Sequence, residues 1–145
     1  MLFRSKEDFG NKGSIVAYNA SFEISVLKRL ANQFQEHKSF IESLIERFVD
    51  LLIPFKNGWY YLPKMGPSAS IKYVLPSIDP DFSYKDLPIN NGGKASEIFL
   101  SMINDQLNNE DEIIRKNLLA YCERDTEGMV VIFKQLKKIT EKISD

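Results

Sequence analysis

The chain combines short, continuous apolar runs with longer segments in which apolar residues recur at helical spacing. The first run, residues 14–18, follows a polar, turn-rich segment and contains β-branched side chains, which is typical of a short buried strand. The second run, residues 48–53, stops at Pro54 and predicts another strand. Residues 1–12 are expected to form a loop or the remnant of a preceding element.

Two amphipathic segments lie between these predicted strands. Their apolar side chains fall on one helical face, which indicates helices over residues 22–34 and 40–48. Asn19 or Ser21 is available to cap the first of them. A strand, a helical connection and a second strand are typical of a parallel crossover unit. The sequence therefore predicts an α/β protein with a short, mostly parallel sheet.

The rest of the chain is expected to be mainly helical, which gives a total of about five or six helices around the sheet. In chain order the pattern predicts a loop or hairpin over 54–67, a short helix ended by Pro76, an ordered loop over 76–94, an amphipathic helix over 95–107, and a helical region from about 110 to 143 with a break near Asp125 and Thr126. All 145 residues are expected to form a single domain.

Composition and charge narrow the class of protein. With 43% hydrophobic and 27% charged residues, the chain is typical of a globular protein and not of a long disordered one. Its net charge of −1 means that nucleic-acid binding would need a local basic patch. No apolar run approaches the roughly 18 residues of a membrane helix, so we expect a cytoplasmic protein without a membrane partner.

The single cysteine and single histidine exclude several kinds of site. One cysteine, Cys122, cannot form an intramolecular disulfide or a multi-cysteine zinc site, and we expect it to pack inside its helix. One histidine, His37, excludes zinc sites that need two imidazoles. Any metal site would therefore depend on carboxylates.

Asn19, Phe22 and Glu23 directly follow the first predicted strand. Side chains at the carboxyl end of a parallel strand face the crevice in which open α/β sheets bind ligands. A carboxylate in the first helical turn at this place can hold a cation, directly or through water. The structural alternative is simple capping, in which Asn caps, Phe packs and Glu interacts favourably with the helix dipole.

Tyr121 and Asp125 are four positions apart in the last helical region and would share a helix face. A carboxylate that binds a metal and a phenol that positions a water are useful together in phosphodiester hydrolysis. The structural alternative is a core tyrosine followed by an aspartate that caps the next helix.

An aromatic and basic stretch follows the second predicted strand. Its aromatic residues are Trp59, Tyr60 and Tyr61, and they lie between the basic residues Lys56 and Lys64. A further lysine, Lys72, lies nearby. In single-strand grooves, bases stack on aromatic rings and phosphates meet lysines. The structural alternative is a hydrophobic hairpin that covers the sheet.

Taken in this order, the first two segments resemble motifs of the DnaQ-like, or DEDD, 3′–5′ exonuclease superfamily, which has an RNase H-like fold. Asn19, Phe22 and Glu23 match its second motif, and Tyr121 and Asp125 match the third motif of its Tyr branch. The His branch would place a histidine at the position of Ala120.

The chain resembles even more closely an uncharacterised bacterial family of unknown function within that superfamily. The matching segments are I-V-A-Y-N-A-S-F-E, F-V-D-L-L-I-P-F, S-I-K-Y-V-L-P and N-G-G-K-A-S, and the resemblance covers residues 13–140. In that family the domain often follows a RecB-like nuclease module, which the resemblance implies as an upstream partner region.

The resemblance implies a role for each matching residue. Asp125 would bind Mg²⁺ or Mn²⁺, Glu23 would hold a second ion through water, and Tyr121 would orient the attacking water or help to deprotonate it. Asn19 and Phe22 would contact the substrate, a single-stranded DNA or RNA end. The aromatic and basic stretch, independently of the resemblance, adds Lys64 and Lys72 as residues that would contact its phosphates.

Two departures from the family pattern affect these expectations. The second motif usually ends in Asp, and Glu23 places the charge farther from the backbone. The first motif, Asp-x-Glu on a strand, supplies the other two carboxylates and is not found upstream of Asn19. We therefore expect the C-terminal portion of such a domain, inactive by itself, with a strand edge exposed to self-association. The alternatives are a non-catalytic module that binds nucleic acid or protein, and a gene fragment without independent function.

Overall fold

The computed structural model describes residues 8–104 and 111–143 and divides the chain into two compact units. The first unit contains the residues up to Tyr61 together with Ala69–Ile71, and the second contains Leu62–Ser68 and the residues from Lys72 onward. The described residues form six α-helices and a two-stranded parallel sheet, so the predicted α/β class is confirmed.

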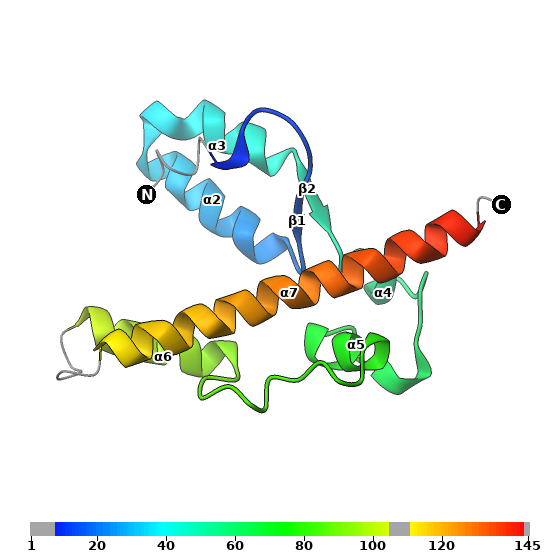
Figure 1. The fold of residues 1–145 in the computed structure, drawn as a ribbon. Helices are drawn as coiled ribbons and strands as arrows, with labels where there is room; N and C mark the ends of the chain where they lie inside the picture. The colour runs from blue at the N-terminus through cyan, green and yellow to red at the C-terminus, as the bar shows by residue number, and fades with distance from the viewer. Residues whose placement is uncertain (1–7, 105–110, 144–145) are drawn as a thin grey trace. The chain divides into compact units, whose positions relative to one another are not determined.

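The first unit is a crossover unit of strand, helices and strand, as Figure 1 shows. Its elements are β1 (Ile15–Ala17), α2 (Ser21–Gln33), the 3₁₀-helix η1 (Gln35–His37), α3 (Lys38–Ile45) and β2 (Phe48–Asp50). The strands are parallel and pair Val16 with Val49. The predicted parallel connection is therefore confirmed.

The core of the first unit lies between the two helices and one face of the sheet. Ala17, Ala31, Ile41 and Leu44 are buried there, and Ile41 is 0% exposed. Successive side chains of a strand point to opposite faces, so Val16 lies on the face opposite to Ala17. Val16 and its partner Val49 are 37% and 44% exposed, and that second face of the sheet is thus open.

The second strand is shorter than its apolar run predicts. It ends at Asp50, and after a turn the short helix α4 (Ile53–Lys56) begins. The Asp50 carboxylate accepts the backbone N–H of Leu52 at 2.9 Å, which turns the chain away from the sheet. Pro54 suits the first helical turn because no donor is needed there.

The second unit is helical in its described residues. It contains the 3₁₀-helix η2 (Pro63–Met65), most of α5 (Ile71–Ile78), α6 (Gly92–Ile103) and α7 (Asp111–Ile143). The segment 54–67 is therefore not a hairpin, because it holds α4 and η2 and none of its residues is in a strand. Within the described residues, no helix is long and apolar enough to cross a membrane.

Two predicted helix boundaries are wrong. Pro76 lies inside α5, which continues for two more residues to Ile78. α6 begins at Gly92, earlier than predicted, because the Asn91 side chain caps it by accepting the backbone N–H of Lys94 at 2.9 Å. The end predicted near residue 107 lies outside the described residues.

The long helix α7 is continuous through the predicted break. The Thr126 hydroxyl donates to the carbonyl of Cys122 at 2.9 Å. Its hydrogen bond is thus made within the helix, and the helix does not have to end there. α5 packs closely against α7 at Gly128, where an added Cβ would lie 2.7 Å from Leu75 Cδ2. Leu75, Val74 and Ile132 are 0% exposed and form the centre of this unit.

Candidate functional site

The carboxyl end of β1 is held in place by Asp50, a residue that the sequence analysis missed. Its carboxylate accepts the backbone N–H groups of Asn19 at 2.8 Å and Ala20 at 3.1 Å, besides that of Leu52. The sequence feature that could have revealed it is an aspartate at the end of an apolar strand, directly before a turn. With three backbone donors on its oxygens, Asp50 fixes the loop from which α2 starts.

The predicted capping of α2 by Asn19 or Ser21 is wrong. The N-cap is Ala20, which has no side-chain oxygen, and no side chain caps this helix. Asn19 adopts a φ of +66°, in the left-handed region that Asn tolerates, and its side chain accepts the Ser21 hydroxyl at 2.8 Å. Asn19 is thus a turn residue whose side chain stays at the exposed end of β1.

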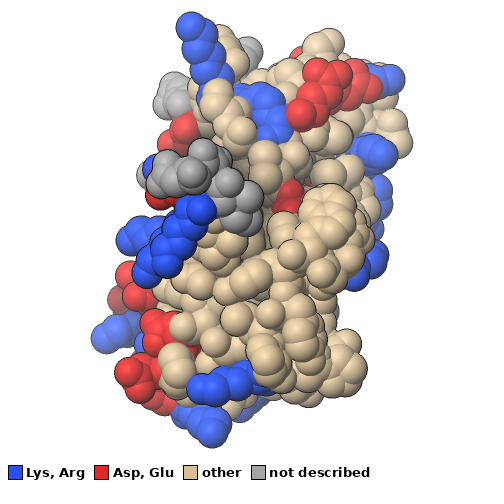
Figure 2. All heavy atoms as spheres, turned by 90° about the vertical axis from the view of Figure 1, so that its right-hand side faces the viewer, with Lys and Arg blue, Asp and Glu red and all other residues tan. Residues whose placement is uncertain are grey.

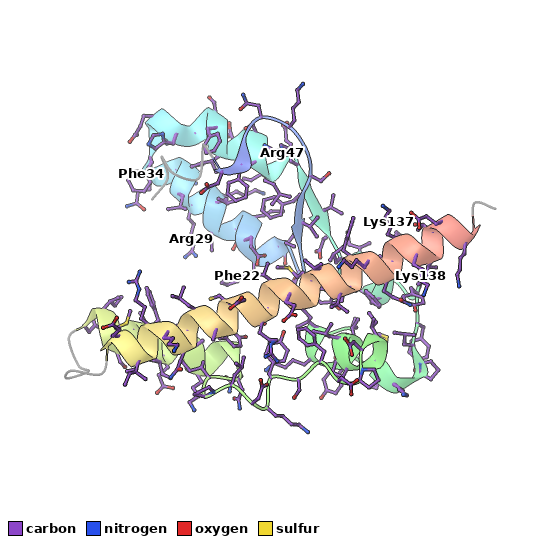
Figure 3. The ribbon with its side chains drawn as sticks, in the orientation of Figure 1. Phe22, Arg29, Phe34, Arg47, Lys137 and Lys138 are labelled. Atoms are coloured by element: carbon purple, nitrogen blue, oxygen red, sulfur yellow. The ribbon has the colours of Figure 1, made fainter. Side chains whose placement is uncertain are left out.

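Phe22 and Glu23 both lie in the first turn of α2 with exposed side chains. Phe22 is 67% exposed, so the structural alternative in which it packs in a core is wrong. In Figure 3 it lies at the end of α2 that is nearest to the strands. The predicted location of Glu23, at the start of the helix after a parallel strand, is confirmed.

Tyr18, the residue after β1, ties this end of the sheet to residues 69–71 of the same unit. Its hydroxyl donates to the carbonyl of Ala69, and its ring centroid lies 6.4 Å from that of Phe55. Burial raises the pKa of Tyr18 above its usual range, and the negative charge of Asp50 adds to the effect. The hydroxyl therefore stays protonated as a donor.

Tyr121 and Asp125 lie one turn apart on α7, and their predicted common face is confirmed. Burial raises the pKa of Tyr121 to about 12, and the negative charge of Asp125 raises it further. Tyr84, from the loop before α6, belongs to the same cluster: its ring centroid lies 6.1 Å from that of Tyr121. The sequence analysis missed Tyr84 because a loop position carries no periodic signal.

The loop that carries Tyr84 is fastened to α7 by Arg124. The guanidinium donates to the carbonyl of Ser83 and to both carboxylate oxygens of Asp86, at 3.3 and 3.1 Å. It also lies 5.5 Å from the centroid of the Phe82 ring. The hydrogen bond from Arg124 holds the pKa of Asp86 below its ordinary value. These contacts give the loop a fixed position on the helix.

The aromatic and basic stretch does not form the covering hairpin of the structural alternative. Trp59 is 73% exposed, whereas Tyr60 packs with its ring centroid 5.6 Å from that of Phe55. Lys64 in η2 and Lys72 in α5 are both exposed, as a phosphate contact requires. Figure 2 shows Lys and Arg side chains spread over one face and interleaved with acidic ones, not gathered into one patch.

The predicted carboxylates are divided between the two units. Glu23 lies in the first and Asp125 in the second, and their meeting stays a prediction. Carboxylate oxygens suit Mg²⁺ and Mn²⁺ in kind. Among the described residues, however, no group of three or more His, Cys, Asp or Glu side chains could hold a metal ion. The carboxylates of Glu23 and Asp125 are therefore the right kind of ligand for Mg²⁺ or Mn²⁺, but two carboxylates are too few to form a complete site.

Cys122 is exposed, so the prediction that it packs inside its helix is wrong. It directly follows Tyr121, and successive positions of a helix point in directions about 100° apart. Because Tyr121 faces the loop with Tyr84, the next side chain turns away from that contact.

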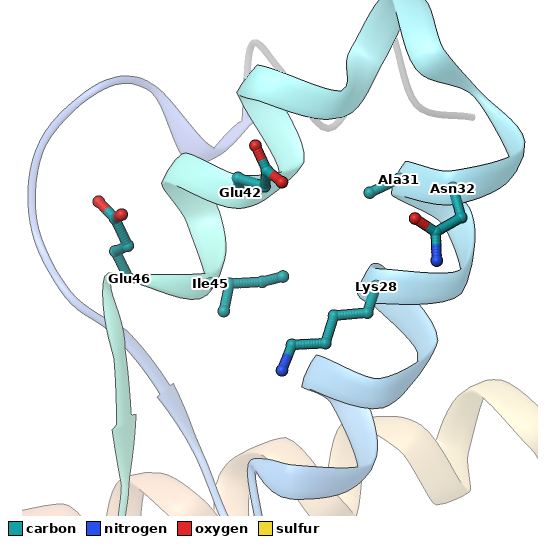
Figure 4. A pocket seen from close by; sticks show the side chains of 6 residues that line it. All are labelled: Lys28, Ala31, Asn32, Glu42, Ile45 and Glu46. Atoms are coloured by element: carbon teal, nitrogen blue, oxygen red, sulfur yellow. The ribbon is translucent and has the colours of Figure 1, made fainter.

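A pocket in the first unit lies apart from the predicted residues. It has a volume of about 490 Å³ and lies between α2 and α3 (Figure 4). The residues that line it are Lys28, Ala31, Asn32, Glu42, Ile45 and Glu46. None of the predicted site residues lines it, and its charged side chains are all exposed. We assign no function to it.

Comparisons with known proteins show that this chain is similar to a protein family and to one relative, neither of which is described with an activity. Residues 2–70 match the family described as Domain of unknown function (DUF2779). The chain is also similar to Uncharacterized protein UU173 of Ureaplasma parvum serovar 3, at 28% identity over 153 residues. That match covers 92% of this chain and 22% of the relative, so the chain spans about a fifth of the relative's length. No solved structure matches. The expected likeness to a family of unknown function is confirmed for residues 2–70.

Proposed function

We propose that this chain contributes part of a metal-dependent 3′–5′ exonuclease site of the DnaQ-like, Tyr-branch type, with an RNase H-like arrangement of its sheet. The observation that carries the proposal is the common face of α7 on which Tyr121 and Asp125 lie one turn apart; burial beside the charge of Asp125 keeps the phenol protonated. A neutral phenol next to a carboxylate is suited to orient a water molecule near a metal ligand.

The first unit supports the proposal through the residues that follow β1. Asn19 and Glu23 lie at the carboxyl end of a parallel strand, the place where open α/β sheets bind ligands. The carboxylate of Asp50 fixes this loop by accepting the N–H of Asn19 at 2.8 Å. Its exposed side chains are therefore presented on a rigid base.

Each residue has a role in the proposed site. Asp125 would bind a divalent ion, and Glu23 would hold a second one through water. Tyr121 orients the attacking water, while Asn19 and Phe22 contact the terminal nucleotides. Lys64 and Lys72 contact phosphates of the single strand. Bound Mg²⁺ or Mn²⁺ would lower the pKa of the water and stabilise the attacking and leaving oxygens.

The proposed site is incomplete with the residues of this chain. Two carboxylates provide few anionic ligands, and the family pattern takes two more from an Asp-x-Glu strand. We propose that these come from polypeptide outside the 145 residues, in a longer protein with a RecB-like nuclease region. This chain alone is therefore expected to bind Mn²⁺ weakly and to hydrolyse DNA or RNA poorly.

The test is NMR observation of the 145-residue chain during titration with Mn²⁺, whose paramagnetism broadens nearby amide signals. We expect the signals of residues around Glu23 and around Asp125 to broaden at the same Mn²⁺ concentration. Asp125→Asn should abolish both effects, whereas Glu123→Gln, which changes an exposed carboxylate on the same helix, should leave them intact.

Two results would contradict the proposal. One is broadening around Asp125 that is unchanged in Asp125→Asn, or that never includes the region of Glu23. The other is robust Mg²⁺-dependent hydrolysis of single strands by this chain alone, which would show that no further carboxylates are needed. Binding of single strands without Mn²⁺ and without dependence on Asp125 would favour the non-catalytic module.

A further inference from the structure

The phenol of Tyr84 has an unusual environment within the second unit. Its oxygen is buried and has no hydrogen-bond partner among the residues that the structure describes. Buried polar groups are nearly always paired, because an unpaired one loses its hydrogen bonds to water without replacement. A phenylalanine would fill the same space without this cost, so packing alone does not explain the hydroxyl.

The hydroxyl lies over one face of α7. An added Cβ at Gly128 would be 3.6 Å from the Tyr84 oxygen, and the Tyr84 and Tyr121 ring centroids are 6.1 Å apart. Positions 121, 125 and 128 share one face of a helix, since they are four and three residues apart. The phenol therefore lies next to the carboxylate of Asp125, between its two neighbours on that face.

The electrostatic surroundings agree with this placement. Burial raises the pKa of Tyr84 above its usual range, and its interaction with the Asp125 carboxylate raises it further. The hydroxyl thus keeps its proton. A phenol that keeps its proton beside a carboxylate can donate a hydrogen bond to it.

The loop holds Tyr84 at this place by contacts on both sides of it in sequence. Before it, the carbonyl of Ser83 accepts from Arg124, and the Phe82 ring lies 5.9 Å from that of Tyr84. After it, Asp86 pairs with the same guanidinium at 3.1 Å. The position of the phenol relative to α7 is therefore determined by the fold.

We propose that Tyr84 is a positioning residue that holds the Asp125 carboxylate in one rotamer on the face of α7. The metal-binding part of this role rests on the proposed function, whereas the rotamer part does not. Tyr84 and Tyr121 flank the carboxylate from the loop and from the helix. The loop before α6 thereby becomes part of the site.

The experiment compares the whole chain with its Tyr84→Phe variant. Three-bond NMR couplings report the side-chain χ1 rotamer of Asp125, and urea unfolding reports stability. The matched control is Tyr73→Phe, which removes an exposed hydroxyl from α5. We expect Tyr84→Phe to be about as stable as the wild type, because the phenylalanine ring fills the same space.

In the same variant, Asp125 should average over several χ1 rotamers, while it keeps one in the wild type and in Tyr73→Phe. Mn²⁺ affinity should fall by roughly tenfold, as it does when groups that orient metal ligands are removed. A merely structural hydroxyl would lower stability and leave the rotamer unchanged.

Two rotamer results would overturn the proposal: a single Asp125 rotamer retained in Tyr84→Phe, or rotamer averaging already present in the wild type. The proposed function fails by a different result, namely Mn²⁺ broadening that does not depend on Asp125. The two failures are therefore distinguishable.

Discussion

At the scale of single residues, two charged side chains organise the backbone around the sheet of the first unit. Asp50 gathers backbone N–H groups at the carboxyl end of the strands. Arg47 binds backbone carbonyl groups at the opposite end of the strands. Its guanidinium donates to the carbonyls of Phe9, Gly10, Lys12 and Gly13 at 2.7–2.9 Å. Figure 3 shows Arg47 next to the loop that leads into β1.

Replacement of Arg47 tests this organisation. Arg47→Met keeps most of the side-chain length and leaves these carbonyls without their charged donor. Since hydrogen bonds from a charged group contribute more than neutral ones, we expect the free energy of unfolding to fall by about 2 kcal/mol. Urea unfolding measures it. Arg29→Met, on an exposed position of α2, is the control and should change stability by less than about 0.5 kcal/mol. Equal losses in both variants would contradict this role.

At the scale of elements, the sequence predicted what depends on local pattern. The run around Ile15 and Val16 predicted β1, and the two amphipathic stretches after it predicted the crossover helices. Boundaries failed where one side chain decides them, as Asn91 does for the start of α6. The common face of Tyr121 and Asp125 followed from helical spacing. Tyr84 and Asp50 could not be found in this way, because their partners lie far away in the sequence.

The contact between α5 and α7 depends on the missing side chain of Gly128. Alanine is usually the better helix former by about 1 kcal/mol. Here, however, its Cβ would lie 2.7 Å from Leu75 Cδ2, and Leu75 is 0% exposed and cannot easily move away. We expect Gly128→Ala to lower the free energy of unfolding by about 1 kcal/mol, because overpacking outweighs helix propensity.

A double-mutant cycle separates the two contributions. In a Leu75→Ala background the clash is gone, so Gly128→Ala should become neutral or stabilising. Chemical denaturation of the four chains gives the coupling energy. If Gly128→Ala has the same effect in both backgrounds, the two residues are not in contact.

At the scale of the whole molecule, the sheet has an edge that the described residues leave open. Ile15 donates to the carbonyl of Arg47 at 2.9 Å, and Ala17 accepts from Leu51 at 2.8 Å, so both face β2. Val16 therefore directs its N–H and C=O away from β2. Its exposed side chain makes this edge apolar as well. Such an edge promotes pairing with another strand.

We expect the chain to self-associate through this edge. Val16→Lys adds a charge at the edge and should shift the weight-average mass in sedimentation equilibrium toward the monomer. Ser25→Lys, on an exposed position of α2, is the control and should not shift it. A wild type that stays monomeric at every concentration would contradict the expectation.

The central claim is that the segments Asn19–Glu23 and Tyr121–Asp125 meet to form one site. Cross-linking tests it most directly. The test chain carries Cys122→Ser, Glu23→Cys and Asp125→Cys, so its two cysteines lie at the predicted site. A thiol-specific reagent that spans about 8 Å, which is the reach of a two-metal site and its ligands, joins the two cysteines if they are close. A chain with cysteines at Glu42 and Asp125 is the control, since Glu42 lies on α3. The account predicts rapid cross-linking of the first pair and little of the second. Equal rates for the two pairs, or no product from the first, would contradict it.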